Sequence, residues 1–203
     1  LYRTSKAAWL ATFLDLTIDN METQHGNPTN DHSISIWKAQ ILGLLLMVPI
    51  AFVCTAPYFA IWGDNALDNA LDGIHGGVLL GVFVGGIVVH EILHGIGWAL
   101  FGRQRWRAIS FGFQFKSLTP YAHVDRMLEA WAYRAGIALP GVVLGLVPWG
   151  ISLVIGHAPL HVFGVVFTLA AVGDGMVLWV LRDLPGHIRV QDHPDRVGCI
   201  VED

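Results

Sequence analysis

The sequence predicts an all-α integral membrane protein with about four transmembrane helices, and two observations lead to this prediction. Hydrophobic residues make up 54% of the 203 residues, charged residues make up only 14%, and the mean hydropathy is +0.53. Soluble domains carry about 25% charged residues, so charge is depleted here by roughly a factor of two. The apolar residues also form runs of about 20 residues, the length that a helix needs to cross a bilayer.

Four stretches of the chain are long and apolar enough to form spans. We place them at Ala39–Gly63, Gly73–Gly102, Ala135 to about Ile155, and Leu160–Leu181. The second and fourth spans each contain one charged residue, Glu91 and Asp174 respectively. Pro140 and Pro148 interrupt the third span and predict kinks there, which membrane helices tolerate when neighbouring helices satisfy the freed backbone groups.

The charges of the loops predict how the spans are oriented. The segment 103–134, between the second and third spans, holds six basic and two acidic residues. The loop 64–72, between the first two spans, holds three aspartates and no basic residue. Because basic loops stay on the cytoplasmic side, we expect segment 103–134 and both termini in the cytoplasm. We expect the membrane to be a bacterial inner (plasma) membrane.

This organisation divides the chain into three parts. Residues 1–38 form a polar cytoplasmic arm that a partner could use, residues 39–181 form a four-span membrane domain, and residues 182–203 form a cytoplasmic tail. The bilayer is the expected environment and partner. The net charge of −4 and the lack of a basic patch with interleaved aromatics give no indication of nucleic-acid binding. Cys54 and Cys199 do not form the pattern of a disulfide framework.

The stretch "VVHEILHGIGW", residues 88–98, places ionisable residues inside the second span. His90, Glu91 and His94 form the pattern H-E-x-x-H. On a helix this spacing puts both imidazoles on one face, with Cβ atoms about 5–6 Å apart, so the two rings can share one metal ion. Zn²⁺ accepts imidazole nitrogen, and catalytic zinc sites use three protein ligands. In such sites the glutamate is a general base and not a ligand.

An alternative is that His90 and His94 are a buried pair satisfied by hydrogen bonds, or that the pattern is a coincidence. By composition alone, the pattern should occur by chance on the order of once per hundred such chains. The position of Glu91 in an apolar span argues against chance, because an intramembrane carboxyl group is costly unless paired and usually marks a functional site. We therefore favour a metal site.

Asp174, in "AAVGDGMVLW", is the candidate for the third ligand. His94 lies eight residues before Gly102, and Asp174 lies eight residues before Arg182, at the cytoplasmic ends of two spans that run in the same direction. At about 1.5 Å per residue, both side chains should lie about 12 Å from the cytoplasmic edge. The alternative for Asp174 is a hydrogen-bonded aspartate between helices or a proton-relay group.

Glycines are predicted to mark close helix contacts. Gly77, Gly81 and Gly85 form successive small-xxx-small steps on the second span, and such steps let helix backbones approach one another. Gly173 and Gly175 flank the aspartate of the fourth span and suit the close approach of another helix.

A short cytoplasmic β-like segment is predicted between the second and third spans. In "SFGFQFK", residues 110–116, Phe111, Phe113 and Phe115 alternate with small or polar residues, and a period of two is typical of a strand. An exposed edge of this strand could hold an extended substrate by β-augmentation. A hairpin at the membrane surface without a role in substrate binding explains the pattern equally well.

Other histidines give weaker indications. His123, in "TPYAHVD", would stabilise an oxyanion or supply a further polar group to the site; the alternative is an ordinary surface histidine. His157 and His161 are also four residues apart, but Pro159 lies between them. We expect this second pair to be ordinary loop histidines.

Several motifs in order along the chain resemble a known family. They are "HEILHG", "TPYAH", "RAGIALPG", "LAAVGDG" and "VQDHPDRVGC". Together they are similar to the zincin membrane peptidases, a domain of unknown function whose site design is similar to that of the site-2 intramembrane metalloproteases. The resemblance extends from about Leu42 to Cys199.

The resemblance implies an H-E-x-x-H-plus-Asp zinc site formed by His90, His94 and Asp174, with Glu91 as the base. The sequence departs from the site-2 pattern at the aspartate, which usually follows leucine as L-D-G but here lies in V-G-D-G. After "PYAH" a cysteine is expected, and this chain has Val124 instead.

These observations predict a zinc-dependent, membrane-embedded metallopeptidase whose site opens to the cytoplasm and which cleaves membrane or membrane-proximal polypeptides. An alternative from another class is a non-catalytic accessory subunit of a larger membrane complex that retains a zinc site. The non-ligating Glu91 argues against a purely structural zinc site, since such sites fill the fourth position with a protein ligand. A proton or ion carrier that uses Glu91 and Asp174 is a third hypothesis, but transport does not require this histidine spacing.

Overall fold

The computed structural model describes residues 30–68, 70–72, 74–114, 119–193 and 196–202. The chain divides into two units, residues 1–31 and 32–203, and all the helices described below belong to the second. Of the predicted N-terminal arm, residues 1–29 lie outside the described part, as does Phe115 of the predicted strand.

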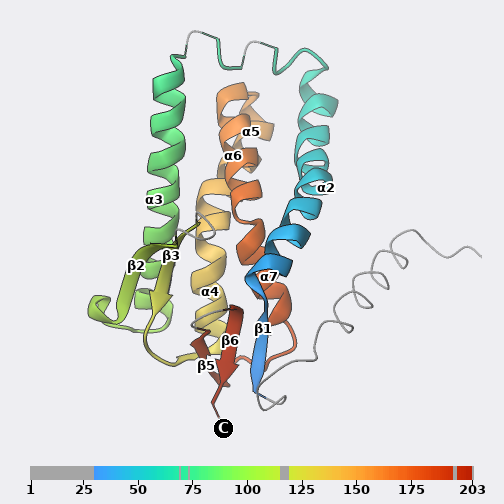
Figure 1. Cartoon of the computed structure of the whole chain (residues 1–203). Helices are drawn as coiled ribbons and strands as arrows, with labels where there is room; N and C mark the ends of the chain where they lie inside the picture. The colour runs from blue at the N-terminus through green and yellow to red at the C-terminus, as the bar shows by residue number, and fades with distance from the viewer. Residues whose placement is uncertain (1–29, 69, 73, 115–118, 194–195, 203) are drawn as a thin grey trace, which may run out of the picture. The chain divides into compact units, whose positions relative to one another are not determined.

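Most of the described chain is helical, as predicted. The helices are α2 (Ile36–Trp62), α3 (Gly76–Phe101), α4 (Ala130–Pro140), η2 (Gly141–Leu146, a π-helix), α5 (Val147–Ile155), α6 (Ala158–Ala170) and α7 (Val172–Val180). By length and composition, three helical segments could cross a membrane, namely α2, α3 and the continuous run Ala130–Ile155. The bent pair α6 and α7 makes a fourth if it counts as one span. This agrees with the expectation of about four apolar spans (Figure 1).

The third helical run starts at Ala130, earlier than the predicted start at Ala135. Arg134, which had set the predicted boundary, lies inside α4 because its guanidinium is satisfied by backbone oxygens. Its Nε donates to the Ala130 carbonyl at 3.1 Å, and its Nη1 donates to the Leu181 carbonyl at 3.1 Å. Where the prolines predicted kinks, the helix changes from α to π geometry directly after Pro140.

The predicted fourth span is broken. Helices α6 and α7 meet at Ala171 with an angle of 42° between them. A methyl group on Gly141 of η2 would lie 3.0 Å from the Ala171 Cβ, so the break is closely packed against the third run. Because a new helix begins here, Asp174 lies in the first turn of α7, where the helix dipole favours a negative charge.

The glycine contact on α3 lies at a different position from the one predicted. Among the described residues, a methyl group added at Gly77, Gly81 or Gly85 would meet no heavy atom within 4 Å, so the predicted close helix contact at these positions is wrong. Within this glycine-rich part of α3, Gly86 does contact another helix, since a Cβ there would overlap the ring of Phe167 in α6.

The description all-α holds only in part, because the mostly helical chain also forms two small sheets. One lies at the predicted β-like segment between α3 and α4, where β2 (Ile109–Gln114) pairs antiparallel with β3 (Thr119–Val124); the short helix η1 (Trp106–Ala108) precedes it. The other is a four-stranded sheet in the order β1-β6-β5-β4. Its strands are β1 (Asp31–Ile34), β4 (Leu128–Glu129), β5 (Arg189–Asp192) and β6 (Val197–Val201).

The C-terminal segment is therefore part of the folded structure and not a tail. Val190 of β5 and Cys199 of β6 are fully buried, whereas Arg189 and Ile200 beside them are exposed, so each strand has one side chain in the core next to one in the open. The buried side chains join a core with residues of α3 and α4. The fully or nearly fully buried members are Trp98, Val124, Leu128, Ala130, Tyr133, Ile137, Leu181, Val190 and Cys199.

Candidate metal centre

The structure brings together three of the residues that the sequence singled out. His90 and His94 of α3 and Asp174 of α7 each offer one ligand atom, and these atoms lie within 4.8 Å of one another. His90 Nε2 is 3.1 Å from one carboxylate oxygen of Asp174, and His94 Nε2 is 3.4 Å from the other. Both histidines are buried, and the Asp174 side chain is 21% exposed.

The helical spacing orients the two imidazoles toward one point. Because His90 and His94 are one turn apart on α3, their ring centroids are 4.9 Å apart, and the ring planes meet at 79°. In this arrangement both Nε2 atoms face the Asp174 carboxylate. Two imidazole nitrogens and one carboxylate oxygen are a donor set that Zn²⁺ accepts.

Close contact between α3 and α4 determines which ring nitrogen of His94 carries the proton. A Cβ at Gly97 would lie 2.6 Å from the Gly136 Cα, so only glycine lets the two backbones come this near. This contact places the Gly136 carbonyl 3.1 Å from His94 Nδ1. Since a carbonyl only accepts, the shared proton belongs to Nδ1, and Nε2 keeps a free lone pair toward Asp174.

Aromatic stacking holds the same imidazole from the other side. Trp98, one turn after His94 on α3, stacks on it with centroids 5.6 Å apart and planes at 17°. Tyr133 of α4 stacks in turn on Trp98 at 5.9 Å and 6°. Trp98 Nε1 donates to the Tyr133 carbonyl at 3.3 Å, so this stack is fixed by a hydrogen bond as well as by packing.

Two buried atoms of the cluster lack hydrogen-bond partners among the described residues, namely His90 Nδ1 and Asp174 Oδ2. Asp174 Oδ2 is close to His90 Nε2, but the contact does not have hydrogen-bond geometry. A buried carboxylate oxygen without a partner is costly, and a cation between the three side chains would satisfy it. The residues therefore fit a metal ion.

Glu91 lies beside the cluster and faces a different partner. Its carboxyl group lies next to the backbone of Ala122 in β3. Glu91 is thus held between α3 and the hairpin and is not among the three grouped ligand atoms. One turn further along α3, Gly95 packs against the hairpin, because a Cβ there would lie 2.8 Å from the Phe111 ring.

The two glycines beside Asp174 face open space in the described part of the structure. A methyl group added at Gly173 or Gly175 would meet no heavy atom of that part within 4 Å. Among the described residues these glycines therefore do not receive another helix, contrary to the sequence-based prediction.

His123 lies outside the cluster and forms a network of its own. Its Nδ1 donates to Asp192 of β5 at 2.6 Å, and its Nε2 is 3.4 Å from Asp125. The hydrogen bond to Asp192 is the main cause that raises the pKa of His123 above its ordinary value. Tyr133 donates to the other Asp192 oxygen at 2.6 Å. His123 therefore connects β3 to the C-terminal sheet, and neither sequence-based role fits it.

His161 is also not the loop residue that we expected. It lies in α6 and is 1% exposed, its Nδ1 is 3.1 Å from Ser152 Oγ, and Tyr58 of α2 stacks on its ring at 4.0 Å. The helix begins at Ala158, directly before Pro159, because proline is accepted in the first turn of a helix. The pair of His157 and His161 therefore contacts no other candidate ligand among the described residues.

Sequence comparison agrees with the geometry of the site. A family model described as "Putative zincin peptidase" matches residues 83–188, just over half of the chain. The matched segment includes both histidines of α3, the glutamate between them and the aspartate of α7. No curated protein and no solved structure matches the chain.

Proposed function

Because the chain belongs to the zincin peptidase family that matches residues 83–188, we propose that it is a zinc-dependent, membrane-embedded metallopeptidase. Its substrates would be membrane or membrane-proximal polypeptides. The observation that carries the proposal is the convergence of His90, His94 and Asp174 from two helices, with Glu91 next to them and outside the ligand set. A purely structural zinc site would need a fourth protein ligand and no adjacent base.

The residues divide the chemistry between them. When bound, zinc supplies a Lewis acid that polarises the scissile carbonyl and lowers the pKa of the attacking water. His90, His94 and Asp174 would hold the ion, and the hydrogen bond from His94 Nδ1 to the Gly136 carbonyl keeps the imidazole oriented. Glu91 would take the proton from the attacking water and deliver it to the leaving amine.

The hairpin β2–β3 supports a way of holding the substrate. Among the described residues β2 pairs only with β3, which leaves its other edge available, and Phe111 and Phe113 are 43% and 45% exposed. An extended segment added to this edge would enlarge the hairpin whose Phe111 ring packs on Gly95 of α3, one residue after His94. A photoreactive residue at Phe113 should then cross-link to substrate, whereas one at the exposed Ile200 of β6 should not.

Metal content of the detergent-purified protein tests the proposal most directly. We expect about one zinc ion per chain in the wild type, because this is a single catalytic site. His90→Ala, His94→Ala and Asp174→Ala should each lower the occupancy strongly, since each removes one of three ligands. Asp183→Ala, an exposed aspartate outside the site, is the matched control. Full occupancy in the Asp174→Ala protein would remove that residue from the ligand set.

Turnover is tested by incubating the protein with isolated membranes and identifying new protein N-termini by mass spectrometry. New termini that depend on Glu91 would support a peptidase. A fully zinc-loaded protein that generates none would instead favour the accessory subunit of a membrane complex.

A further inference from the structure

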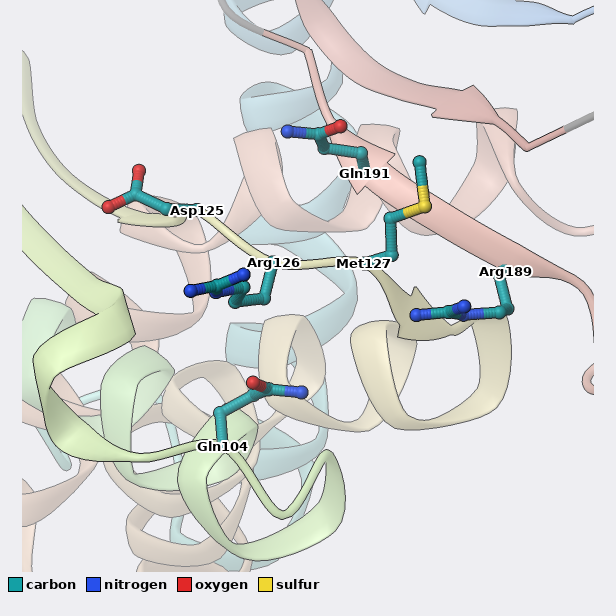
Figure 2. Close-up of a pocket in the computed structure, with 6 residues that line it drawn as sticks. All are labelled: Gln104, Asp125, Arg126, Met127, Arg189 and Gln191. Carbon is teal, nitrogen blue, oxygen red and sulfur yellow. The ribbon is translucent and has the colours of Figure 1, made fainter.

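Two adjoining surface cavities lie away from the metal centre. One, of about 360 Å³, is lined by Gln104, Asp125, Arg126, Met127, Arg189 and Gln191 (Figure 2). The other, of about 530 Å³, shares Gln104, Met127 and Arg189 with the first. Because of these common walls we treat them as one feature, the arginine groove.

The apolar wall of the arginine groove lies where two apolar spans end. Leu100 and Phe101 are the last residues of α3, and Trp131 lies in the first turn of α4. Leu100 is 67% exposed and Trp131 is 47% exposed. Aromatic residues at the ends of spans are typical of the boundary between hydrocarbon and headgroups. The groove therefore lies at headgroup depth if α3 and α4 span the bilayer.

The polar wall carries three arginines, and two of them have no internal partner among the described residues. Within the described part of the chain, Arg103 and Arg126 have no hydrogen bond or ion pair. Arg189 shares an exposed ion pair with Glu202 at 3.4 Å. Figure 2 shows Arg126 on the connection before β4 and Arg189 on β5, with Gln104 on the turn after α3.

The acidic residues of the groove have other partners. Asp125 faces His123 at 3.4 Å, and Glu129 accepts a hydrogen bond from Trp131 Nε1 at 2.5 Å. Neither carboxylate is therefore paired with Arg103 or Arg126. The two unpaired guanidinium groups are available to an anion from outside the chain.

The backbone at Arg103 is a second, independent observation. Arg103 has φ of 49° and follows the last turn of α3, a left-handed position that glycine normally occupies. It is the only non-glycine residue with positive φ among those that the structure describes. The chain thus keeps a guanidinium on the groove wall at a position where glycine would be less strained.

We propose that the arginine groove binds the phosphate headgroup of an anionic phospholipid. Arg103 and Arg126 would hold the phosphate with their planar, forked donors, and Arg189 would add charge. The acyl chains would lie along Leu100 and Phe101 toward the bilayer. Basic pockets between membrane helices on the cytoplasmic side bind anionic headgroups by the same chemistry. This inference does not depend on the proposed peptidase activity.

The test compares phosphatidylglycerol with phosphatidylcholine on the intact, detergent-purified chain, with bound lipid counted by native mass spectrometry. Selective retention of phosphatidylglycerol is expected. Arg103→Gln and Arg126→Gln should each weaken it by about five-fold, the effect of removing one basic group near an anionic headgroup. Arg105→Gln and Arg107→Gln, in the same loop but not on the groove wall, are the matched controls and should change it little.

Three outcomes would overturn the inference. Equal losses in the groove and control variants would mean that only the general surface potential attracts the lipid. Displacement of the lipid by millimolar inorganic phosphate would assign the groove to a soluble anion. Full retention of phosphatidylglycerol by an Arg103→Gln, Arg126→Gln double variant would also exclude the groove. Arg126→Lys keeps the positive charge but loses the planar, forked donors of the guanidinium. This variant therefore tests the role of Arg126 in binding if Arg126→Gln does not fold.

Discussion

Glu91 and Asp174 are both carboxylates in apolar helices, but their surroundings suit them to different roles. Asp174 faces the Nε2 atoms of His90 and His94, and one of its oxygens has no hydrogen-bond partner among the described residues. Glu91 instead lies next to the backbone of Ala122 in the hairpin. The first environment suits a metal ligand, and the second suits the proposed general base, which lies beside the ligand set and outside it.

This difference leads to a prediction for Glu91→Gln. The variant should keep its zinc, because Glu91 is not a ligand, but it should lose turnover by about 10²–10⁴-fold, the usual contribution of a general base. Metal analysis and the appearance of new N-termini from membrane substrates measure the two effects separately. Glu202→Gln, a surface change of the same kind, should affect neither. Loss of zinc together with turnover would instead make Glu91 part of the ligand set.

The pKa of His123 gives a prediction about pH. Its hydrogen bond to Asp192 raises the pKa, so the charged imidazole stabilises the folded state. This stabilisation is complete below the ordinary histidine pKa of about 6.5 and is lost as the pH rises through the higher folded value. The protection factors of the amides in β5 and β6, which are corrected for the pH dependence of intrinsic exchange, should therefore fall above neutral pH. In His123→Gln, the protection should be lower at low pH and this transition should be absent; an unchanged transition would assign it to another group.

At the scale of elements, the contact between α3 and α4 determines the geometry of the site. Gly97 and Gly136 let the two backbones touch, and this contact brings the Gly136 carbonyl to His94. The break at Ala171 has a similar effect on the other side, because it starts α7 just before Asp174. The ligands are thus held by rigid helices and not by loops.

We therefore expect Gly97→Ala to destabilise the protein by about 1–3 kcal/mol, the usual cost of overpacking. The new methyl group would lie 2.6 Å from the Gly136 Cα and would push α4 away from α3. Gly81→Ala is the matched control on the same helix, since its methyl group would meet no atom within 4 Å. The free energy of unfolding in detergent and the affinity for zinc should both be lower in Gly97→Ala and unchanged in Gly81→Ala. Equal stability and equal zinc affinity of the two variants would show that the contact between α3 and α4 is not needed for the fold or for the site.

At the scale of the whole molecule, the positive charge of segment 103–134 predicts the orientation of the spans. We predict that this segment and the C-terminal sheet face the cytoplasm, with loop 64–72 on the other side. In intact cells, a membrane-impermeant thiol reagent should label Asp64→Cys but not Asp183→Cys. Both positions are exposed, and the native Cys54 and Cys199 are buried, so the background should be low. The reverse pattern would invert the topology.

The local features of the site could be read from the sequence. The spacing of His90 and His94 is a property of one helix, and the depth of Asp174 follows from counting residues along a parallel span. The period of two in residues 110–116 predicted a strand for the same reason, and the structure has β2 at Ile109–Gln114. These signals depend only on helix and strand repeats, which neighbouring residues determine.

Other features were decided by the tertiary structure alone. Glu91 lies next to the backbone of Ala122, and His94 next to the carbonyl of Gly136; every residue carries backbone atoms, so no residue type marks these contacts. Asp192 meets His123 only because β5 folds back beside the hairpin, 69 residues along the chain. The sequence by itself thus determined the apolar spans and the candidate ligands. The three-dimensional packing decided which atoms orient those ligands, because such contacts join segments that are distant in the chain.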